Sequence, residues 1–311
     1  MNYRKFATRK IEEIRRKVGK GTAVSALSGG VDSTVTTVLG YFAIGKRLKV
    51  IFLDDGLMRE GEPQAVKASF RKIGIDVKIV NVQKKFFAAL RGLTDPEEKR
   101  KAFRETFYRT FQKAVRDTGA PFLLQGTIAP DIIETKGGVK TQHNVLEQIG
   151  INTKKGYSFT AIEPLKTLYK PGVREVGKAL ALPVRMHQRM PFPGPGLLCR
   201  CLGEATPERI AVVRKACRIV EEETMKFKPF QTFAVLLADR ATGLTADKKR
   251  AFGHIVAVRC VHSKDAMTAK AVRLPWPALE RTRDRILAEV PGVSKVVYDL
   301  TGKPPSTIEY I

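Results

Sequence analysis

The chain has 311 residues, 43% hydrophobic and 28% charged, with a formal net charge of +25. This length favours about two domains, each large enough to bury a core, and the composition excludes a largely disordered chain. Every apolar run is shorter than the roughly 20 residues that span a bilayer, so no membrane-spanning helix is expected. The basic, amphipathic N-terminus lacks an apolar core segment and a cleavage site, so we expect a solvated first helix and no secretion signal.

The positive charge predicts polyanionic partners, which include nucleotides, nucleic acids and acidic proteins. No RGG tract, zinc knuckle or alternation of aromatic and basic residues accompanies it, so a nucleic-acid module has weak support. Cys199, Cys201, Cys217 and Cys260 show no C-x-x-C spacing, and we expect Cys199 and Cys201 on opposite faces of a strand. A zinc site or a disulfide framework is therefore not expected, and a reducing cytoplasm suits the chain.

Residues 1–190 alternate strand-like and helix-like patterns, which predicts an α/β domain with a doubly wound parallel sheet. The expected strands are residues 22–27, 48–53, 77–82, 122–127 and 159–162. The expected helices are residues 33–45, 63–73, 84–118 and 171–181. Ligands of such sheets bind at the carboxyl ends of the strands, near the point where the strand order reverses.

Residues 28–33 read Ser-Gly-Gly-Val-Asp-Ser and lie between the first expected strand and the first helix of this domain. The unpaired amides of a helix N-terminus, the helix dipole and two glycines together make a site for a phosphate. Ser28 and Ser33 can donate hydrogen bonds, and Asp32 is a candidate magnesium ligand beside a polyphosphate. No Gly-Lys pair is followed by Ser or Thr, so this is not a Walker loop. The bland alternative is an ordinary Gly-Gly turn with a Ser/Asp helix cap.

Two further segments of the first domain are candidates for function, each with a purely structural alternative. Asp54 and Asp55 follow the second expected strand, where they either face a nucleotide or merely end the strand in a turn. Residues 129–158 are rich in glycine and mixed charge with little periodicity, which predicts a long loop. Such a loop is either a lid over the site or a solvated excursion.

Residues 191–311 read as a second, smaller α+β domain with a mainly antiparallel sheet. A Pro- and Gly-rich hinge at residues 190–196, which cannot be helical, connects it to the first domain. The expected helices are residues 207–225 and 277–290, and the expected strands are residues 232–237, 254–261 and 295–300. The chain closes on residues 302–309, where two prolines fix the backbone between Lys303 and Glu309, so this charged end is either solvated or a binding edge.

The motifs together resemble the GMP synthases. The loop at residues 28–33 is similar to the pyrophosphate loop of the N-type ATP pyrophosphatases, and the segments Pro-Phe-Pro-Gly-Pro-Gly (191–196) and Lys-Pro-Pro-Ser-Thr-Ile-Glu (303–309) are typical of the GMP synthases alone. The resemblance extends from about residue 20 to the end. It implies an ATP-pyrophosphatase fold of the adenine nucleotide alpha-hydrolase type, followed by a dimerisation domain.

The resemblance also implies a reaction and the residues that carry it. XMP would be adenylated by ATP with Mg²⁺, pyrophosphate would leave, and ammonia would then displace AMP to give GMP. The implied ATP contacts are Ser28, Gly29, Gly30, Val31, Asp32, Ser33, Leu53, Gly126 and Thr127, with Asp32 as the magnesium ligand. The implied catalytic residues are Lys140, His143, Asp131 and Glu134. The implied XMP contacts are Arg189, Pro191, Gly194, Gln231, Arg240, Lys303, Thr307, Ile308 and Glu309.

The chain departs from the family pattern in the lid, where Gln142 replaces the first of two histidines, and it lacks the glutaminase domain. The resemblance is therefore to the two-subunit form, with ammonia supplied by a separate glutamine amidotransferase subunit, and it implies a cytoplasmic homodimer. Two alternatives remain. One is a tRNA-modifying ATP pyrophosphatase, which the positive charge favours. The other is a catalytically degenerate nucleotide-binding paralogue, which Gln142 favours.

Overall fold

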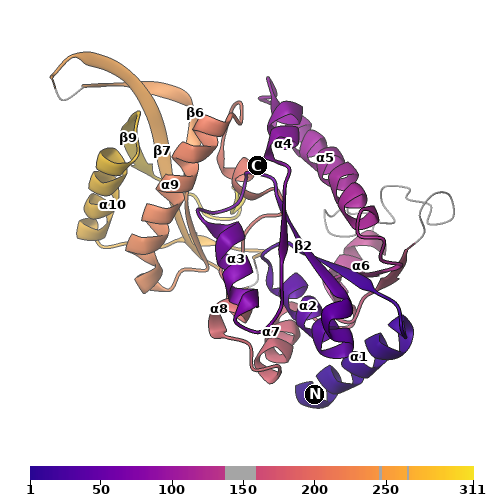
Figure 1. Cartoon of the computed structure of the whole chain (residues 1–311). Coiled ribbons are helices and arrows are strands. Elements are labelled where there is room, and N and C mark those ends of the chain that lie inside the picture. Colours follow the sequence, from indigo (N-terminus) through magenta and orange to yellow (C-terminus); the bar gives the residue numbers. More distant parts are fainter. Residues whose placement is uncertain (137–158, 245–246, 265) are drawn as a thin grey trace. The chain divides into compact units, whose positions relative to one another are not determined.

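The computed structural model of the chain describes residues 1–136, 159–244, 247–264 and 266–311 (Figure 1). Contacts between residues divide the chain into two compact units. The first unit comprises Met1–Asp54, Gly61–Val82 and Glu105–Arg189. The second comprises Asp55–Glu60, Gln83–Arg104 and Met190–Ile311.

The second unit thus includes two segments that precede the hinge in the sequence. Long-range hydrogen bonds connect these two segments to residues that follow the hinge. The amide of Leu197 donates to the carbonyl oxygen of Leu57 over 2.7 Å. The Lys99 ammonium, which is fully buried, donates to the carbonyl oxygens of Cys201 and Gly203 over 2.6 and 2.8 Å. A simple division of the sequence at residue 190 misses both segments.

The described strands of the first unit form one parallel sheet in the order β3-β2-β1-β4-β5. They are β1 (Ala23–Leu27), β2 (Leu48–Asp54), β3 (Lys78–Asn81), β4 (Phe122–Leu124) and β5 (Thr160–Ile162). β1 and β2 are almost entirely buried, as expected for central strands covered on both faces. The predicted parallel α/β sheet is confirmed, and the strand order reverses between β1 and β4.

Helices cover this sheet on both faces. The helices of the first unit are α1 (Tyr3–Val18), α2 (Val31–Ile44), α3 (Glu62–Arg71), the later part of α5 (Pro96–Arg116), α6 (Ala129–Lys136), α7 (Lys170–Ala179) and α8 (Val184–His187). Right-handed crossovers place α2 and α3 on one face of the sheet and α5 on the other. α1 and α7 pack against α2 (Figure 1). The single helical stretch expected at residues 84–118 is two helices, α4 (Gln83–Leu90) and α5.

Two expectations about the first unit were wrong. α1 is not merely a solvated helix, because Phe6, Ile14 and Val18 are buried and Arg15 donates to the carbonyl oxygen of Ala43 over 3.1 Å. The expected loop at residues 129–158 begins with a helix, α6, whose eight residues include both predicted acidic residues. Burial of an amphipathic stripe explains the first error.

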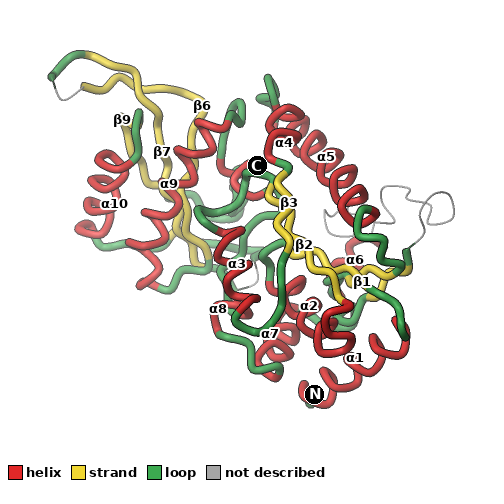
Figure 2. Tube along the Cα trace, in the orientation of Figure 1, coloured by secondary structure: helices red, strands yellow, loops and turns green. Residues whose placement is uncertain are grey.

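The second unit is built on a smaller sheet in which β7 is the central strand. Its strands are β6 (Gln231–Leu244), β7 (Arg250–His262), β8 (Lys270–Ala271) and β9 (Val293–Tyr298). β7 pairs antiparallel with β6 and β8 and parallel with β9, because α10 (Trp276–Glu289) carries the chain back between them. α9 (Pro207–Thr224) packs on β6, and the β6–β7 hairpin extends beyond the part that α9 covers (Figure 2). The mainly antiparallel sheet is confirmed.

The cysteine-containing segment does not form the expected strand. Residues Gly196–Arg200 form a 3₁₀ helix, which we label η2, and Cys201 follows it. All four cysteines are buried free thiols in the second unit. Among the described residues, no helix is both long and apolar enough to cross a bilayer.

Candidate active site

The predicted phosphate site lies at the carboxyl end of β1, where residues 28–33 lead into α2; we call these residues the phosphate loop. Gly29 has φ +74°, a left-handed conformation that glycine adopts readily. Gly30 is the N-cap residue and has no side chain with which to cap the helix. Gly29 is buried whereas Gly30 is exposed. The first-turn amides of α2 are therefore available to an anion at this end of the sheet.

The two serines of the phosphate loop stabilise it through hydrogen bonds inside the loop. The hydroxyl oxygens of Ser28 and Ser33 are 3.0 Å apart, and Ser33 also accepts a hydrogen bond from the amide of Ser28 over 3.2 Å. Ser33 and Thr34 both donate to the carbonyl oxygen of Gly30, over 3.1 and 2.8 Å. Because the hydroxyls are engaged inside the loop, its backbone amides are the groups most directly available to a phosphate.

Asp32, in the first turn of α2, has the features of a cation ligand. Its Oδ2 lies 2.5 Å from the Nζ of Lys170, the first residue of α7. Its Oδ1 is buried and has no hydrogen-bond partner among the described residues. That orphaned carboxylate oxygen fits Mg²⁺, which is commonly held by one or two carboxylates together with substrate phosphates. In the described part of the chain, no cluster of three or more His, Cys, Asp or Glu side chains forms a site held by protein alone.

The loop that follows β4 lies against the start of α2, across the point where the strand order reverses. A Cβ atom on Gly126 would lie 2.9 Å from the carbonyl carbon of Asp32 and 3.0 Å from the amide nitrogen of Ser33. The next residue, Thr127, is buried and donates its hydroxyl to Glu163 over 2.6 Å. The structure therefore brings the predicted ATP residue Gly126 directly onto the phosphate loop, at the location where doubly wound sheets bind nucleotides.

The remaining predicted residues of the first unit are placed as follows. Leu53 is buried in β2 next to β1. Asp131, on α6, accepts a hydrogen bond from the amide of Ile128 over 2.9 Å. Glu134 belongs to the same helix. Lys140 and His143 lie outside the described residues.

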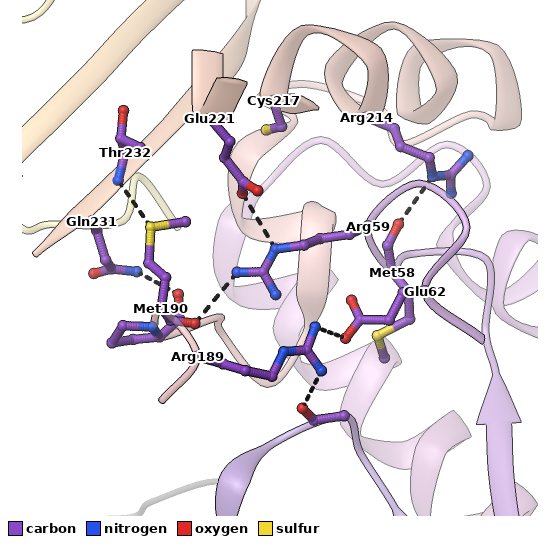
Figure 3. Close-up of polar contacts among 12 residues, drawn as sticks. Met58, Arg59, Glu62, Arg189, Met190, Arg214, Cys217, Glu221, Gln231 and Thr232 are labelled. Atoms are coloured by element: carbon purple, nitrogen blue, oxygen red, sulfur yellow. Dashed lines mark hydrogen bonds and ion pairs between the residues drawn. The ribbon is translucent and has the colours of Figure 1, made fainter. Parts of the chain in front are cut away.

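Arg189, for which the sequence predicts a contact with XMP, is bound to the phosphate loop of its own unit. Its Nη1 donates to the carbonyl oxygen of Gly29 and its Nη2 to Oε1 of Glu62, both over 2.6 Å (Figure 3). Glu62 opens α3 and is only 4% exposed. Sequence reasoning missed both Glu62 and Lys170, because each is one charged residue at the start of an amphipathic helix, a position where charge is ordinary.

In the second unit, the end of the chain is held by a buried arginine. We call residues 303–309 the C-terminal tail. Arg200 of η2 is fully buried, and its guanidinium binds both carboxylate oxygens of Glu309, over 2.8 and 3.0 Å. Gln231 of β6 donates to the same carboxylate over 3.0 Å and to the carbonyl oxygen of Pro191 over 3.2 Å. Burial alone would lower the pKa of Arg200, but Glu309 raises it above its ordinary value. The Arg200 guanidinium therefore stays charged.

A second arginine of this unit fixes the backbone of the tail. Arg259 of β7 is fully buried, and it donates to the carbonyl oxygens of Thr307 and Ile308 over 2.9 and 3.3 Å. Its Nη1 lies 2.9 Å from Asp299 and donates to the carbonyl oxygen of Thr301. The predicted XMP residues Thr307, Ile308 and Glu309 are thereby gathered by two arginines that the sequence analysis missed. The available signal was a lone arginine inside an apolar run, in Leu-Leu-Cys-Arg-Cys-Leu and in Val-Arg-Cys-Val.

The hinge contributes an aromatic ring to the same region of the second unit. Phe192 has the guanidinium of Arg59 4.1 Å from its ring centre and that of Arg200 5.0 Å away. Arg59 also donates to Glu221 over 3.3 Å and to the carbonyl oxygen of Met190 over 3.4 Å (Figure 3). The hinge is thus held between charged groups of its own unit, which gives the predicted contact Pro191 a fixed position beside Gln231.

Two predicted XMP residues are engaged elsewhere in the second unit. Lys303 donates to the carbonyl oxygen of Ala266 over 2.8 Å, and Arg240 donates to that of Phe252 over 2.5 Å at the surface of the β6–β7 hairpin. Gly194 lies in the hinge immediately before η2. The described contacts do not bring Arg240 to the group formed by Arg200, Gln231 and Glu309.

A doubly wound parallel sheet with a glycine-rich anion site at its switch point is the arrangement of nucleotide-binding α/β proteins. Comparison with known proteins identifies the family to which the chain belongs. A family model described as NAD synthase matches residues 4–194, and one described as GMP synthase C terminal domain matches residues 218–310. The solved structure of NMN synthetase from Francisella tularensis superposes with a TM-score of 0.47 at 16% identity, over 63% of this chain and 78% of that one.

Curated relatives match the chain from end to end. The B subunit of the glutamine-hydrolyzing GMP synthase of Archaeoglobus fulgidus is 50% identical over 311 residues, and that of Pyrococcus abyssi 48% identical over 313 residues, with 100% of both chains covered in each case. The same protein of Methanosarcina acetivorans is 50% identical over 307 residues, covering 98% of each chain. The chain belongs to the family of GMP synthase B subunits.

Proposed function

We propose that this protein synthesises GMP from XMP, as the synthetase subunit of a two-subunit GMP synthase. The C2 oxygen of XMP attacks the α-phosphorus of ATP, and the bond to pyrophosphate breaks. Ammonia then adds at C2 and AMP leaves, which yields GMP. Adenylation is needed because the C2 oxygen is a poor leaving group until it carries a phosphoryl group. The observation that carries this proposal is the phosphate loop at the switch point of a chain that is similar throughout its length to GMP synthase subunits.

The first unit supplies the site for ATP. Negative charge accumulates on pyrophosphate as it departs, and the amides at the start of α2 are oriented to stabilise it without reorganisation. Asp32 would hold Mg²⁺, which when bound offsets the charge of the triphosphate. Lys170, which is paired with Asp32, would be a neighbouring cation for the phosphates. Leu53, Gly126 and Thr127 would surround the rest of ATP.

The second unit supplies the site for XMP, centred on the C-terminal tail. Glu309 retains acceptor capacity after binding Arg200 and Gln231, since a carboxylate has about four lone-pair positions. Pro191 and Gly194 of the hinge, with Gln231 and residues 307–309, would surround the nucleotide. Arg240 and Lys303 would serve its phosphate if they were released from their present carbonyl partners. A planar guanidinium and an ammonium suit that role.

The segment that includes Lys140 and His143 is proposed as a catalytic lid that begins at α6. The adenylated intermediate would hydrolyse in water, so a cover over the site has a clear purpose. Asp131 and Glu134 would assist its closure. The relatives are named as one subunit of a glutamine-hydrolyzing enzyme, which supports a separate glutaminase subunit as the source of ammonia. A homodimer through the second unit and a cytoplasmic location complete the proposal.

The decisive assay follows AMP, pyrophosphate and GMP with the purified chain, XMP, Mg-ATP and ammonium. We expect all three products with ammonium, and no GMP when glutamine is the sole nitrogen source. GMP formation with glutamine alone would contradict a separate glutaminase. The tRNA-modifying alternative instead requires turnover that depends on tRNA and falls steeply with salt, and the degenerate paralogue requires no turnover at all.

A further inference from the structure

The carbonyl oxygen of Gly29 is held by a charge-assisted hydrogen bond that reaches the phosphate loop from a distant part of the first unit. Arg189 provides it over 2.6 Å, and Glu62 holds the same guanidinium over 2.6 Å (Figure 3). Glu62 is almost fully buried, and Arg189 is 27% exposed. Such ionic hydrogen bonds are about twice as strong as neutral ones. The contact is therefore strong enough to fix the backbone of the loop.

The orientation of one peptide group follows from this contact. The Gly29–Gly30 peptide is planar, so its carbonyl oxygen and the N–H of Gly30 point in opposite directions. Since the carbonyl of buried Gly29 is directed to Arg189, the N–H of exposed Gly30 is directed away from it. That N–H lies 3.4 Å from the hydroxyl oxygen of Ser28, which is near the limit of a hydrogen bond and leaves the N–H weakly held.

Among the described contacts, Arg189 and the long hydrogen bond to Ser28 are the ones that restrain this peptide. Both residues that flank it are glycines, and glycine tolerates positive and negative φ about equally. Rotation of the peptide by half a turn would therefore cost little in the backbone itself. The rotated peptide would present a carbonyl oxygen where the loop otherwise offers an N–H, and an oxygen repels phosphate.

Packing supports the same assignment. A Cβ atom on Gly29 would lie 2.6 Å from Oε1 of Glu62 and 3.4 Å from Nη1 of Arg189, so the loop is in close contact with this ion pair. Gly61 and Glu62 begin α3, and Arg189 ends the first unit. Three separate segments of one unit thus converge on a single carbonyl group.

We propose that Arg189 and Glu62 are a positioning pair for the phosphate loop, which keeps the N–H of Gly30 directed toward the pyrophosphate moiety of ATP. This assignment replaces the predicted role of Arg189 as an XMP contact. It rests on the proposed function insofar as the loop binds the pyrophosphate of ATP. Arg189 acts through the Gly29–Gly30 peptide and needs no contact with either substrate.

The test compares three variants with a matched control. Arg189→Met removes the donor, Arg189→Lys restores one donor without the fork, and Glu62→Gln removes the charge that orients Arg189. Arg185→Met is the control, because Arg185 is an exposed cation four residues before Arg189. For each variant we would measure KM for ATP, KM for XMP, kcat, and the Kd for inorganic pyrophosphate by calorimetry without XMP or ATP.

We expect Arg189→Met to raise KM for ATP and Kd for pyrophosphate by about tenfold or more, the usual effect of losing one ionic hydrogen bond. The KM for XMP should stay within about twofold of the wild-type value. Arg189→Lys should recover part of the affinity for ATP and pyrophosphate, and Glu62→Gln should weaken both in the same way as Arg189→Met but less. Arg185→Met should match the wild type. If Arg189→Met fails to fold, Arg189→Lys and Glu62→Gln decide the matter.

A rise in KM for XMP with ATP and pyrophosphate unaffected would overturn the proposal and restore Arg189 as an XMP contact. Equal changes for both substrates would also overturn it. If wild-type protein binds pyrophosphate but forms no GMP, the proposed reaction fails while the positioning pair stands on the calorimetric data. If it forms GMP but the variants bind pyrophosphate normally, the positioning pair fails alone.

Discussion

The phosphate loop of the first unit is built from glycines and short hydroxyls, whereas the C-terminal tail of the second unit is held by two arginines with no exposed surface. The loop follows directly from β1 and needs small residues, because an anion must approach its backbone closely. Apart from an isolated bridge at Lys303, the tail itself forms no helix or strand, so its carbonyl groups and its one carboxylate need donors from other segments. Local geometry thus forms the phosphate loop, to which one long-range ion pair is added, whereas long-range ionic hydrogen bonds hold the tail.

The largest expected effect is loss of Asp32 from the phosphate loop. Asp32→Ala should abolish measurable pyrophosphate release, a loss of at least about 10²–10³ in kcat, because it removes the carboxylate nearest the proposed metal. Asp117→Ala, an exposed acidic residue after α5, is the control. Turnover by Asp32→Ala at the wild-type rate would remove the loop from the mechanism.

A large structural effect is expected from the tail. Arg200→Met should destabilise the second unit by about 3–5 kcal/mol, because removing one partner of a buried ion pair leaves the other uncompensated. Urea unfolding would measure this. The double variant Arg200→Met/Glu309→Gln should be less destabilised than the sum of the two single variants, which reports their coupling. Simple additivity would show that the contact does not stabilise the tail.

A moderate effect on the KM for ATP alone is expected when Gly126 is replaced. Gly126→Ala places a methyl group 2.9 Å from backbone of Asp32, so the start of α2 must shift. Overpacking of this kind costs about 1–3 kcal/mol, and we expect it to appear as a raised KM for ATP. The KM for XMP serves as the internal control. A change in both constants would mean that the loop and the XMP site respond together.

Replacement of Glu309 is expected to affect the KM for XMP rather than the KM for ATP. Glu309→Ala should raise KM for XMP by about tenfold and KM for ATP much less, since it removes a charged acceptor and frees Arg200 from the tail. Steady-state kinetics with each substrate varied in turn would measure both constants. A larger effect on ATP would contradict the assignment of the tail to XMP.

The smallest effect concerns the thiols, all of which lie in the second unit. Burial raises the pKa of Cys199 to about 12, so at pH 8 this thiol is protonated and unreactive in the folded protein. Thiol labelling should therefore report opening of the second unit, and XMP should slow it more than ATP does. Mass spectrometry would count the labelled cysteines. Equal protection by ATP would mean that the two units open together.

Local patterns predicted much of the fold. Strand and helix positions in both units follow from runs of buried residues, and β1, the phosphate loop and α2 are contiguous, so one stretch of sequence contains the entire motif. Errors arose where burial depended on distant partners, as for the buried face of α1 and for η2. The start of α6 was missed because its periodicity is weak over eight residues.

By itself, the sequence determined the sheet, the position of the phosphate loop and the family, because these depend on neighbouring residues and on motifs that are contiguous. Only the tertiary structure decided which charged residues bind the phosphate loop and the C-terminal tail. Arg189 meets Gly29 across 160 residues, and Arg200 meets Glu309 across 109. No local pattern encodes such a pair, because a buried charge is stabilised by whichever partner the fold brings to it.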